Sequence, residues 1–129
     1  LETLLFAADR RWHIENIIKP SLEIYDYVIS DRYVYSSVAY QTVSSLINEE
    51  YIYIVNRHIL KPDYSFFIDI EPELTLKRIN RKKNIFEELS YLRKVYKIYR
   101  NMVKKGYLIR IEGRARVDDI VEVILKYII

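Results

Sequence analysis

The chain has 129 residues, of which 50% are hydrophobic and 30% charged, and its formal net charge is +3. This length suits one domain with a real core, so we expect a single domain over residues 1–129. Cysteine is absent and no apolar run reaches the roughly 18 residues of a membrane span, so we expect no disulfide, no thiolate metal site, no membrane partner and a cytoplasmic location.

The first part of the chain predicts a helix, a strand and two further helical stretches. Residues 3–18 predict a helix that Pro20 interrupts, and residues 20–25 predict a short further turn. Residues 25–30, YDYVIS, are rich in aromatic and β-branched residues and predict a short strand. Ser36 or Ser37 is then in position to cap a helical turn. A stripe of apolar side chains recurs at helical spacing in the first helix: Leu4, Leu5, Ala8 and Trp12.

The rest of the chain alternates between helices and strands. Helices are predicted at 46–60, 71–81, 85–105 and 117–129, and strands at 64–70 and 107–113. Gly106 is placed to end the long third helix of this set. Such alternation is typical of an α/β fold with a three-layer arrangement, in which a parallel sheet carries helices on both faces.

Polar side chains follow each predicted strand, at Ser30-Asp31-Arg32, at Asp69 and at Glu112-Gly113-Arg114. Ligands of parallel α/β sheets bind outside the carboxyl ends of the strands. An arginine beside a carboxylate is suited to hold a phosphate, because its fork donates two parallel hydrogen bonds. Asp31 and Arg32 are therefore candidate site residues, although a surface Asp–Arg pair in a loop is equally compatible with their spacing.

Phe6 and Arg10 lie four residues apart and so share one helical face, which differs from the apolar stripe. A ring beside a guanidinium is suited to stack a planar base and bind its carbonyl. The alternative is a packing or cation–π contact between the two side chains.

Charge and glycine content limit the possible ligands. Lys77–Lys83 carries five cations in seven positions, which fits either a solvated helix end or an anion site. Basic and acidic residues are otherwise interleaved, so we expect no nucleic-acid partner. The only glycines are Gly106 and Gly113, and neither belongs to a Walker-type phosphate loop.

Several motifs in order resemble thymidylate kinases. These are LLFAADRRWH, SDRYVYSSVAYQ about twenty residues later, LKPDYSFFIDIEPELTLKRI, NIFEE, YLRKVYKIY and IEGRARVDDIVEVI. The resemblance covers essentially the whole sequence, and the Asp-Arg-Tyr box is its most specific part. It implies a fold of the P-loop nucleoside-monophosphate-kinase type. It also implies transfer of the γ-phosphoryl group of ATP, with Mg²⁺, to dTMP in dTTP biosynthesis, by a protein that forms a homodimer.

The resemblance also implies roles for individual residues. Phe6 would stack on thymine, and Arg10 would reach a thymine carbonyl or the nucleotide phosphate. Arg32 would hold the acceptor phosphate, and Asp31 would lie near Mg²⁺ and its waters. Ser37 and Gln41 would line the base and sugar pocket, and Tyr40 would lie against the sugar. A lid over the donor phosphates would include Arg78, Arg81 and Lys82. Arg114 would lie near adenine.

The sequence departs from the family pattern in several places. The strand and Gly-rich loop that open the family, and an acidic residue that follows the loop, are not among these residues. The segment between AYQ and INEEYIY is short and lacks the Gly-rich stretch often seen there. The lid is abbreviated, and Ile85 stands where many relatives carry arginine. We therefore expect the sequence to be a fragment or to omit flexible pieces. Two alternatives stay open: another nucleoside or nucleotide kinase of the same fold, and a catalytically inactive nucleotide-binding module.

Overall fold

The structure is a computed structural model that describes residues 1–79 and 85–129. The chain divides into two compact units, Leu1–Lys61 and Pro62–Ile129, which are described here one at a time. The expectation of a single domain over the whole chain stays a prediction.

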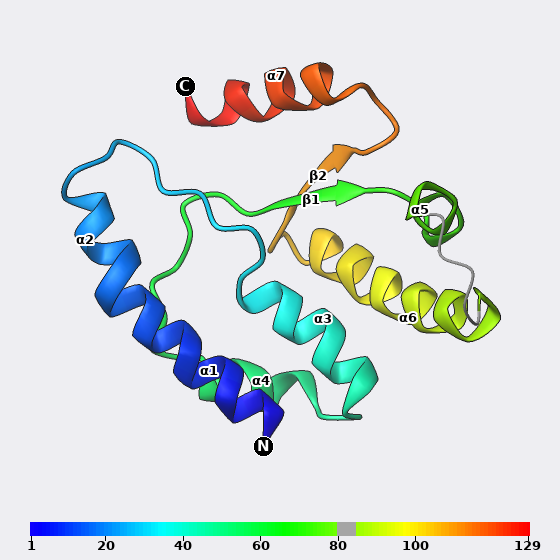
Figure 1. Cartoon of the computed structure of the whole chain (residues 1–129), viewed down its shortest axis with the longest axis horizontal. Helices are drawn as coiled ribbons and strands as arrows, with labels where there is room; N and C mark the ends of the chain where they lie inside the picture. Colours follow the sequence, from blue (N-terminus) through cyan, green and yellow to red (C-terminus); the bar gives the residue numbers. More distant parts are fainter. Residues whose placement is uncertain (80–84) are drawn as a thin grey trace. The chain divides into compact units, whose positions relative to one another are not determined.

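The first unit is entirely helical in its regular structure (Figure 1). Its core is formed by side chains from three helices, among which Ile14, Val38 and Ile52 are fully buried. Asn48 caps the last helix, because its side-chain oxygen accepts a hydrogen bond from the Glu50 backbone N–H at 2.9 Å. The elements are α1 (Glu2–His13), the π-helix η1 (Ile14–Ile18), α2 (Lys19–Leu22), α3 (Val34–Ser44) and α4 (Glu49–Val55).

Pro20 does not end the first helix, which corrects the sequence prediction. Figure 1 shows α1, η1 and α2 as one continuous helical rod that runs to Leu22. Within η1 the turn widens, and the Lys19 N–H bonds to the Ile14 carbonyl five residues earlier. Pro20 then falls at the second residue of α2, where the lack of an N–H is tolerated.

The predicted strand at residues 25–30 is wrong. This segment pairs with no other strand in the part of the chain that the structure describes, and Ile29 is 90% exposed. β-branched and aromatic residues favour a strand only where neighbouring strands and a packed face support them. Ser36 and Ser37 also do not cap α3, since they lie inside its first turn and Tyr33 precedes it.

The apolar stripe of α1 is also not the face that the first unit buries. Leu5 is 61% exposed and Trp12 59% exposed, whereas Thr3 and Ile14 are buried. The covered face therefore combines polar and apolar side chains, and the half-buried Arg10 lies on it.

The second unit contains a two-stranded parallel sheet, with two helices between its strands and one after the second strand. The register pairs Phe66 with Ile109 and Asp69 with Glu112. Phe66 packs edge-on against Tyr127 of α7, whereas Phe67 stacks on Tyr99 of α6, as the alternation of side chains along a strand requires. The elements are β1 (Phe66–Asp69), α5 (Pro72–Ile79), α6 (Ile85–Lys104), β2 (Ile109–Glu112) and α7 (Val117–Ile128).

Each of these five elements is of the predicted kind, helix or strand, although its boundaries differ from the prediction. The wider three-layer sheet stays a prediction. Gly106 has a φ of 76° and follows the end of α6, as expected for a left-handed residue after a helix. Gly113 fills a different need: a Cβ there would lie 2.9 Å from the Asp69 carbonyl oxygen and would clash with the Ile70 side chain. The close approach at the ends of the two strands therefore requires glycine.

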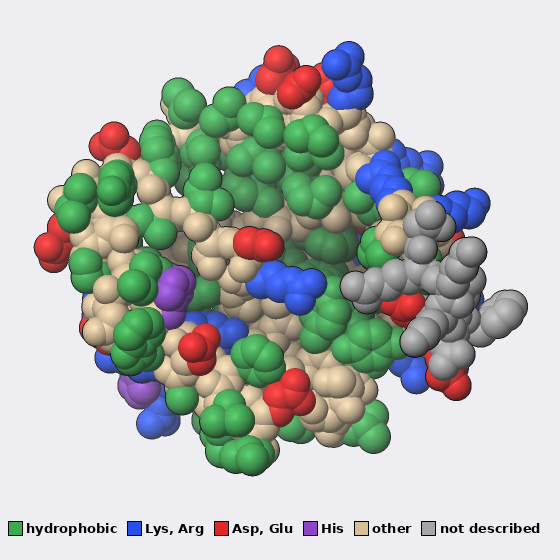
Figure 2. Space-filling view, viewed as in Figure 1, with side chains coloured by type: hydrophobic (Ala, Val, Ile, Leu, Met, Phe, Trp, Pro, Cys, Tyr) green, Lys and Arg blue, Asp and Glu red, His purple; other side chains and the backbone are tan. Residues whose placement is uncertain are grey.

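Apolar side chains gather on the surface of α7 (Figure 2). Val117 and Val121 are both exposed, although the helix contacts β2. No helix in residues 1–79 and 85–129 combines the length and apolarity that a membrane span requires.

Candidate functional site

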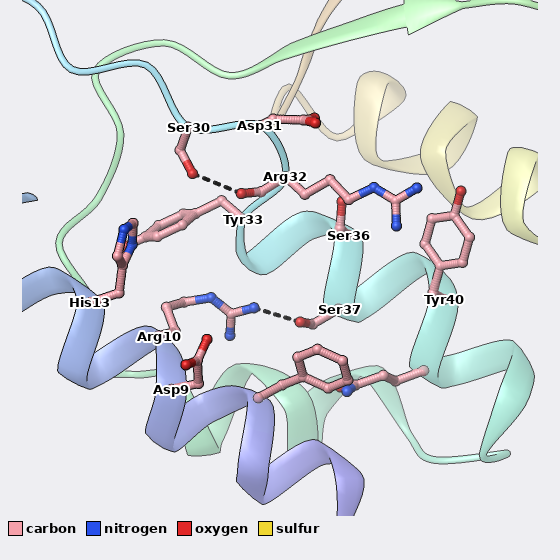
Figure 3. A pocket seen from close by; sticks show the side chains of 12 residues that line it. Asp9, Arg10, His13, Ser30, Asp31, Arg32, Tyr33, Ser36, Ser37 and Tyr40 are labelled. Atoms are coloured by element: carbon pink, nitrogen blue, oxygen red, sulfur yellow. Dashed lines mark hydrogen bonds between the residues drawn. The ribbon is translucent and has the colours of Figure 1, made fainter. Parts of the chain in front are cut away.

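A pocket of about 390 Å³ lies within the first unit, between α1, the loop that precedes α3, and α3 itself (Figure 3). Residues of α1 reach it at positions 6, 9, 10 and 13, and residues of α3 at positions 36, 37, 40 and 41, so each helix presents one face. The lining consists of Phe6, Asp9, Arg10, His13, Ser30, Asp31, Arg32, Tyr33, Ser36, Ser37, Tyr40 and Gln41. All seven site residues predicted in the first unit are in this set.

Arg10 is held from two sides by neutral oxygens. Its Nη2 donates to Ser37 Oγ at 2.6 Å, and the two side chains point toward each other in Figure 3. Its Nη1 donates to Asn56 Oδ1. The guanidinium also lies over the Tyr33 ring, with 5.5 Å between its carbon and the ring centroid. Ser37, Asn56 and Tyr33 therefore fix the plane of the Arg10 side chain.

No carboxylate forms an ion pair with Arg10 in the part of the chain that the structure describes. Burial of the guanidinium lowers the pKa of Arg10 from its ordinary value, and the nearby Tyr33 and Asp9 only partly oppose this shift. A half-buried cation with neutral partners keeps much of its desolvation cost. An oxygen of a ligand, whether a carbonyl or an anion, would offset that cost.

Arg32 has a left-handed backbone, with a φ of 65°. This conformation is unusual for a residue with a side chain and costs roughly 1–2 kcal/mol. The guanidinium lies over the Tyr40 ring, 5.0 Å from its centroid. Arg32 is exposed, and not buried as an arginine held in a closed crevice would be. It makes no ion pair with Asp31, and both residues are exposed in the loop before α3, so the phosphate role of Arg32 stays a prediction beside the alternative of a surface loop.

Asp31 lines the same pocket with an exposed carboxylate. It makes no ion pair with any described residue. Among residues 1–79 and 85–129, no group of three or more His, Asp and Glu side chains is arranged to hold a metal. Magnesium ions are often held by one or two carboxylates together with substrate phosphates, and a single exposed aspartate fits that kind of site.

Gln41 is 4% exposed, and neither atom of its side-chain amide has a hydrogen-bond partner among the described residues. Buried amides are nearly always paired, because an unpaired one costs about 1–3 kcal/mol. Gln41 also lines the pocket. Its amide offers both a donor and an acceptor, which a base edge with N–H and carbonyl groups would satisfy.

The remaining predicted site residues belong to the second unit or lie outside the described residues. Arg78 Nη1 lies 3.5 Å from the Gly113 carbonyl oxygen. Arg114 forms a two-pronged pair with Glu71, in which Nε donates at 3.0 Å. Arg81 and Lys82 are outside the described residues. The lid and adenine roles of these four residues are untested.

Asp69, at the end of β1, binds two arginines of the second unit. Arg100 Nη1 donates to its Oδ2 at 2.6 Å, and Arg110 Nε donates to the same oxygen. Burial would raise the pKa of Asp69, but hydrogen bonds from Arg110, Tyr96 and Arg100 outweigh burial and lower it. This polar strand end is therefore satisfied within its own unit and ties α6 and β2 to β1.

Sequence reasoning missed Asn56, whose amide contacts Arg10 from 46 residues away. It also missed Tyr33, whose hydroxyl donates to the Leu60 carbonyl at 2.9 Å and whose ring lies under Arg10. Burial raises the pKa of the Tyr33 hydroxyl despite the nearby Arg10 cation. The only sequence signal for Asn56 was an amide at the end of an otherwise apolar helix, which also fits an ordinary helix end.

Comparison with known proteins gives a consistent result. The sequence model of the family described as "Thymidylate kinase" matches residues 1–124. A probable thymidylate kinase of Staphylothermus marinus is 33% identical to the chain, over 100% of the chain and 68% of that protein. A probable thymidylate kinase of Methanocaldococcus jannaschii is 39% identical, over 97% of the chain and 65% of that protein. A thymidylate kinase of Acholeplasma laidlawii is 31% identical, over 99% of the chain and 68% of that protein.

The chain thus spans between 65% and 68% of the length of these three curated relatives. A probable thymidylate kinase of Thermococcus kodakarensis is 42% identical over 83% of the chain, which spans 49% of that protein.

Proposed function

The chain belongs to the thymidylate kinase family, and we propose that the protein that carries it transfers the γ-phosphoryl group of ATP to dTMP, which gives dTDP. The observation that carries this proposal is the buried face of the pocket. There the Arg10 guanidinium has only neutral partners and the Gln41 amide has none among the described residues. A thymine base offers a carbonyl oxygen to the first and a mixed donor–acceptor edge to the second.

The other pocket residues have roles that follow from their positions. The Phe6 ring stacks on the base, with a contribution of about 1–3 kcal/mol if stacking of single-stranded bases is a guide. Ser37 shares the Arg10 side of the pocket. The Tyr40 ring lies against the sugar and crowds a 2′-hydroxyl. Arg32 holds the acceptor phosphate, and its left-handed backbone is a strain of the kind that functional sites retain.

Phosphoryl transfer requires positioning and charge neutralisation more than covalent chemistry from the protein. Arg32 supplies a fixed cation at the acceptor phosphate, supported by the Tyr40 ring. Asp31 would hold Mg²⁺ through its waters, and the ion would neutralise charge on the transferring phosphates. Arg78, Arg81 and Lys82 would form the lid that excludes water from the donor phosphates, and Arg114 would lie near adenine.

We extend the proposal to the fold and assembly of the protein. The parallel pair of β1 and β2 would belong to a wider three-layer sheet of the P-loop nucleoside-monophosphate-kinase type. The protein would form a homodimer and work in the cytoplasm in dTTP biosynthesis.

The test is formation of dTDP from dTMP and ATP with magnesium, measured by chromatography on the whole protein that carries this chain. Replacement Arg32→Ala should slow turnover roughly thirtyfold or more, because closure of the site would remove water from the pair of Arg32 with the acceptor phosphate, and a desolvated pair contributes about 2 kcal/mol or more. Arg11→Ala is the matched control, since Arg11 bonds the His58 carbonyl and Glu15 at the surface.

Equal rates for the two arginine variants would refute the role of Arg32. If the parent protein binds dTMP without turnover, the inactive binding module is the better description. Faster turnover of another nucleoside monophosphate would favour a kinase of different base preference.

A further inference from the structure

Asn56 is the one side chain that contacts the Arg10 guanidinium without lining the pocket, within the part of the chain that the structure describes. We propose that Asn56 is a positioning residue that sets the orientation of Arg10 for nucleotide binding. This inference rests on the proposed function only in taking dTMP as the ligand.

The orientation of the Asn56 amide is determined by its partners. Its Nδ2 donates to the Ile52 carbonyl at 2.7 Å, one turn earlier in α4. Its Oδ1 must therefore face the other way, and there it accepts from Arg10 Nη1. A reversed amide would set two donors against each other at Arg10 and two acceptors against each other at Ile52.

The anchor is also rigid, because Asn56 is 4% exposed and lies at the end of α4. Its backbone N–H bonds to the Tyr53 carbonyl at 3.2 Å, and its own carbonyl accepts from the Ile59 N–H at 3.2 Å. A side chain with backbone and side-chain bonds on both sides has little freedom to follow a moving partner.

Arg10 needs such an anchor for a chemical reason. Arginine presents its N–H donors in a fixed planar fork, so two oxygens that hold Nη1 and Nη2 also set the direction of the remaining donors. Ser37 and Asn56 hold those two nitrogens from α3 and α4. A hydroxyl can rotate to follow a moving donor, whereas the Asn56 amide is held by Ile52 and cannot. Asn56 thus aims the free donors of Arg10 at the ligand.

The experiment is a double-mutant cycle on the whole protein that carries this chain, with dTMP affinity measured by NMR titration to millimolar ligand. Asn56→Ala should weaken dTMP binding on the order of tenfold, because it removes the hydrogen bond that orients the Arg10 guanidinium, the charged group that binds the ligand. In an Arg10→Lys background the same replacement should change the affinity less than twofold, since a lysine cannot span Ser37 and Asn56.

Asn48→Ala is the matched control. Asn48 is the same residue type at the other end of α4, it is exposed, and it caps the helix through the Glu50 N–H. Its loss should lower the melting temperature and leave dTMP affinity unchanged. If weakening of α4 were itself enough to reduce dTMP affinity, the affinity would fall in both Asn48→Ala and Asn56→Ala.

If Asn56→Ala does not fold, Asn56→Asp keeps the oxygen but adds a charge that competes with the ligand for Arg10. It should therefore weaken dTMP binding with Arg10 in place and have less effect with Lys at that position. Equal effects of an Asn56 replacement in the two backgrounds would overturn the positioning role. Failure of the parent protein to bind dTMP would instead count against the proposed function.

Discussion

Gln41→Met should stabilise the protein and weaken its binding of dTMP, two effects in opposite directions. The Gln41 amide is buried and has no partner among the described residues, so the folded state retains the cost of its desolvation. Methionine has a similar length and no amide. The replacement should therefore raise the free energy of unfolding by about 1–3 kcal/mol and the melting temperature by several degrees.

The same replacement removes a donor and an acceptor from the pocket. If the base edge pairs with the amide, dTMP affinity should fall about fivefold, equivalent to roughly 1 kcal/mol. Thermal unfolding without ligand and calorimetric titration with dTMP measure the two effects separately, on the whole protein.

Thr42→Val is the matched control, because Thr42 Oγ1 is also buried without a partner among the described residues, but Thr42 does not line the pocket. This variant should gain stability and keep its dTMP affinity. Unchanged affinity in Gln41→Met, together with lower stability, would show that the amide is paired in the free protein and takes no part in binding.

Three further outcomes are expected. Gly113→Ala should lower the free energy of unfolding by about 1–3 kcal/mol in denaturant titration, because a Cβ there lies 2.9 Å from the Asp69 carbonyl oxygen. The folded-state pKa of Asp69 lies below its unfolded value, so the carboxylate stabilises the fold above about pH 4 and that contribution fades as the pH falls through the folded pKa. The difference in the free energy of unfolding between the parent and Asp69→Asn should therefore shrink in acid. A difference that stays constant with pH would contradict a stabilising role of the Asp69 carboxylate. Tyr40→Ala should narrow the preference for dTMP over its ribose counterpart in calorimetry, and an unchanged ratio would leave Tyr40 a packing residue.

The sequence was most informative where local pattern and tertiary packing agree. The helical pattern of residues 85–105 is continuous, and the structure has a long helix there, α6 (Ile85–Lys104), with the left-handed Gly106 after it as predicted. Residues 64–70 are nearly all apolar, and their central part forms β1 with packed side chains on both faces. In the helix the residues near in sequence decide the outcome, whereas in β1 the local pattern agrees with the pairing to β2.

Local pattern was misleading where structure depends on distant partners. Residues 25–30 have the composition of a strand, but a strand exists only with a neighbour that shares its hydrogen bonds. In the candidate site, too, local contacts were predictable and distant ones were not. The spacing of Phe6 and Arg10 predicted that they share one helical face, and both line the pocket. The contact between Arg10 and Asn56 spans 46 residues and depends on how α4 packs.

The π-helical turn at Ile14–Ile18 sets the rotational phase of α1. An α-helix advances about 100° per residue, and a π turn accommodates one additional residue within an otherwise regular helix. A regular α-helix wound through the same residues would add about 100° and so rotate everything before the turn by roughly a quarter turn relative to α2. Arg10 would then leave the pocket while every pocket side chain remained in the sequence. The spacing of residues 14–18 is therefore as much a part of the binding site as the side chains that line it.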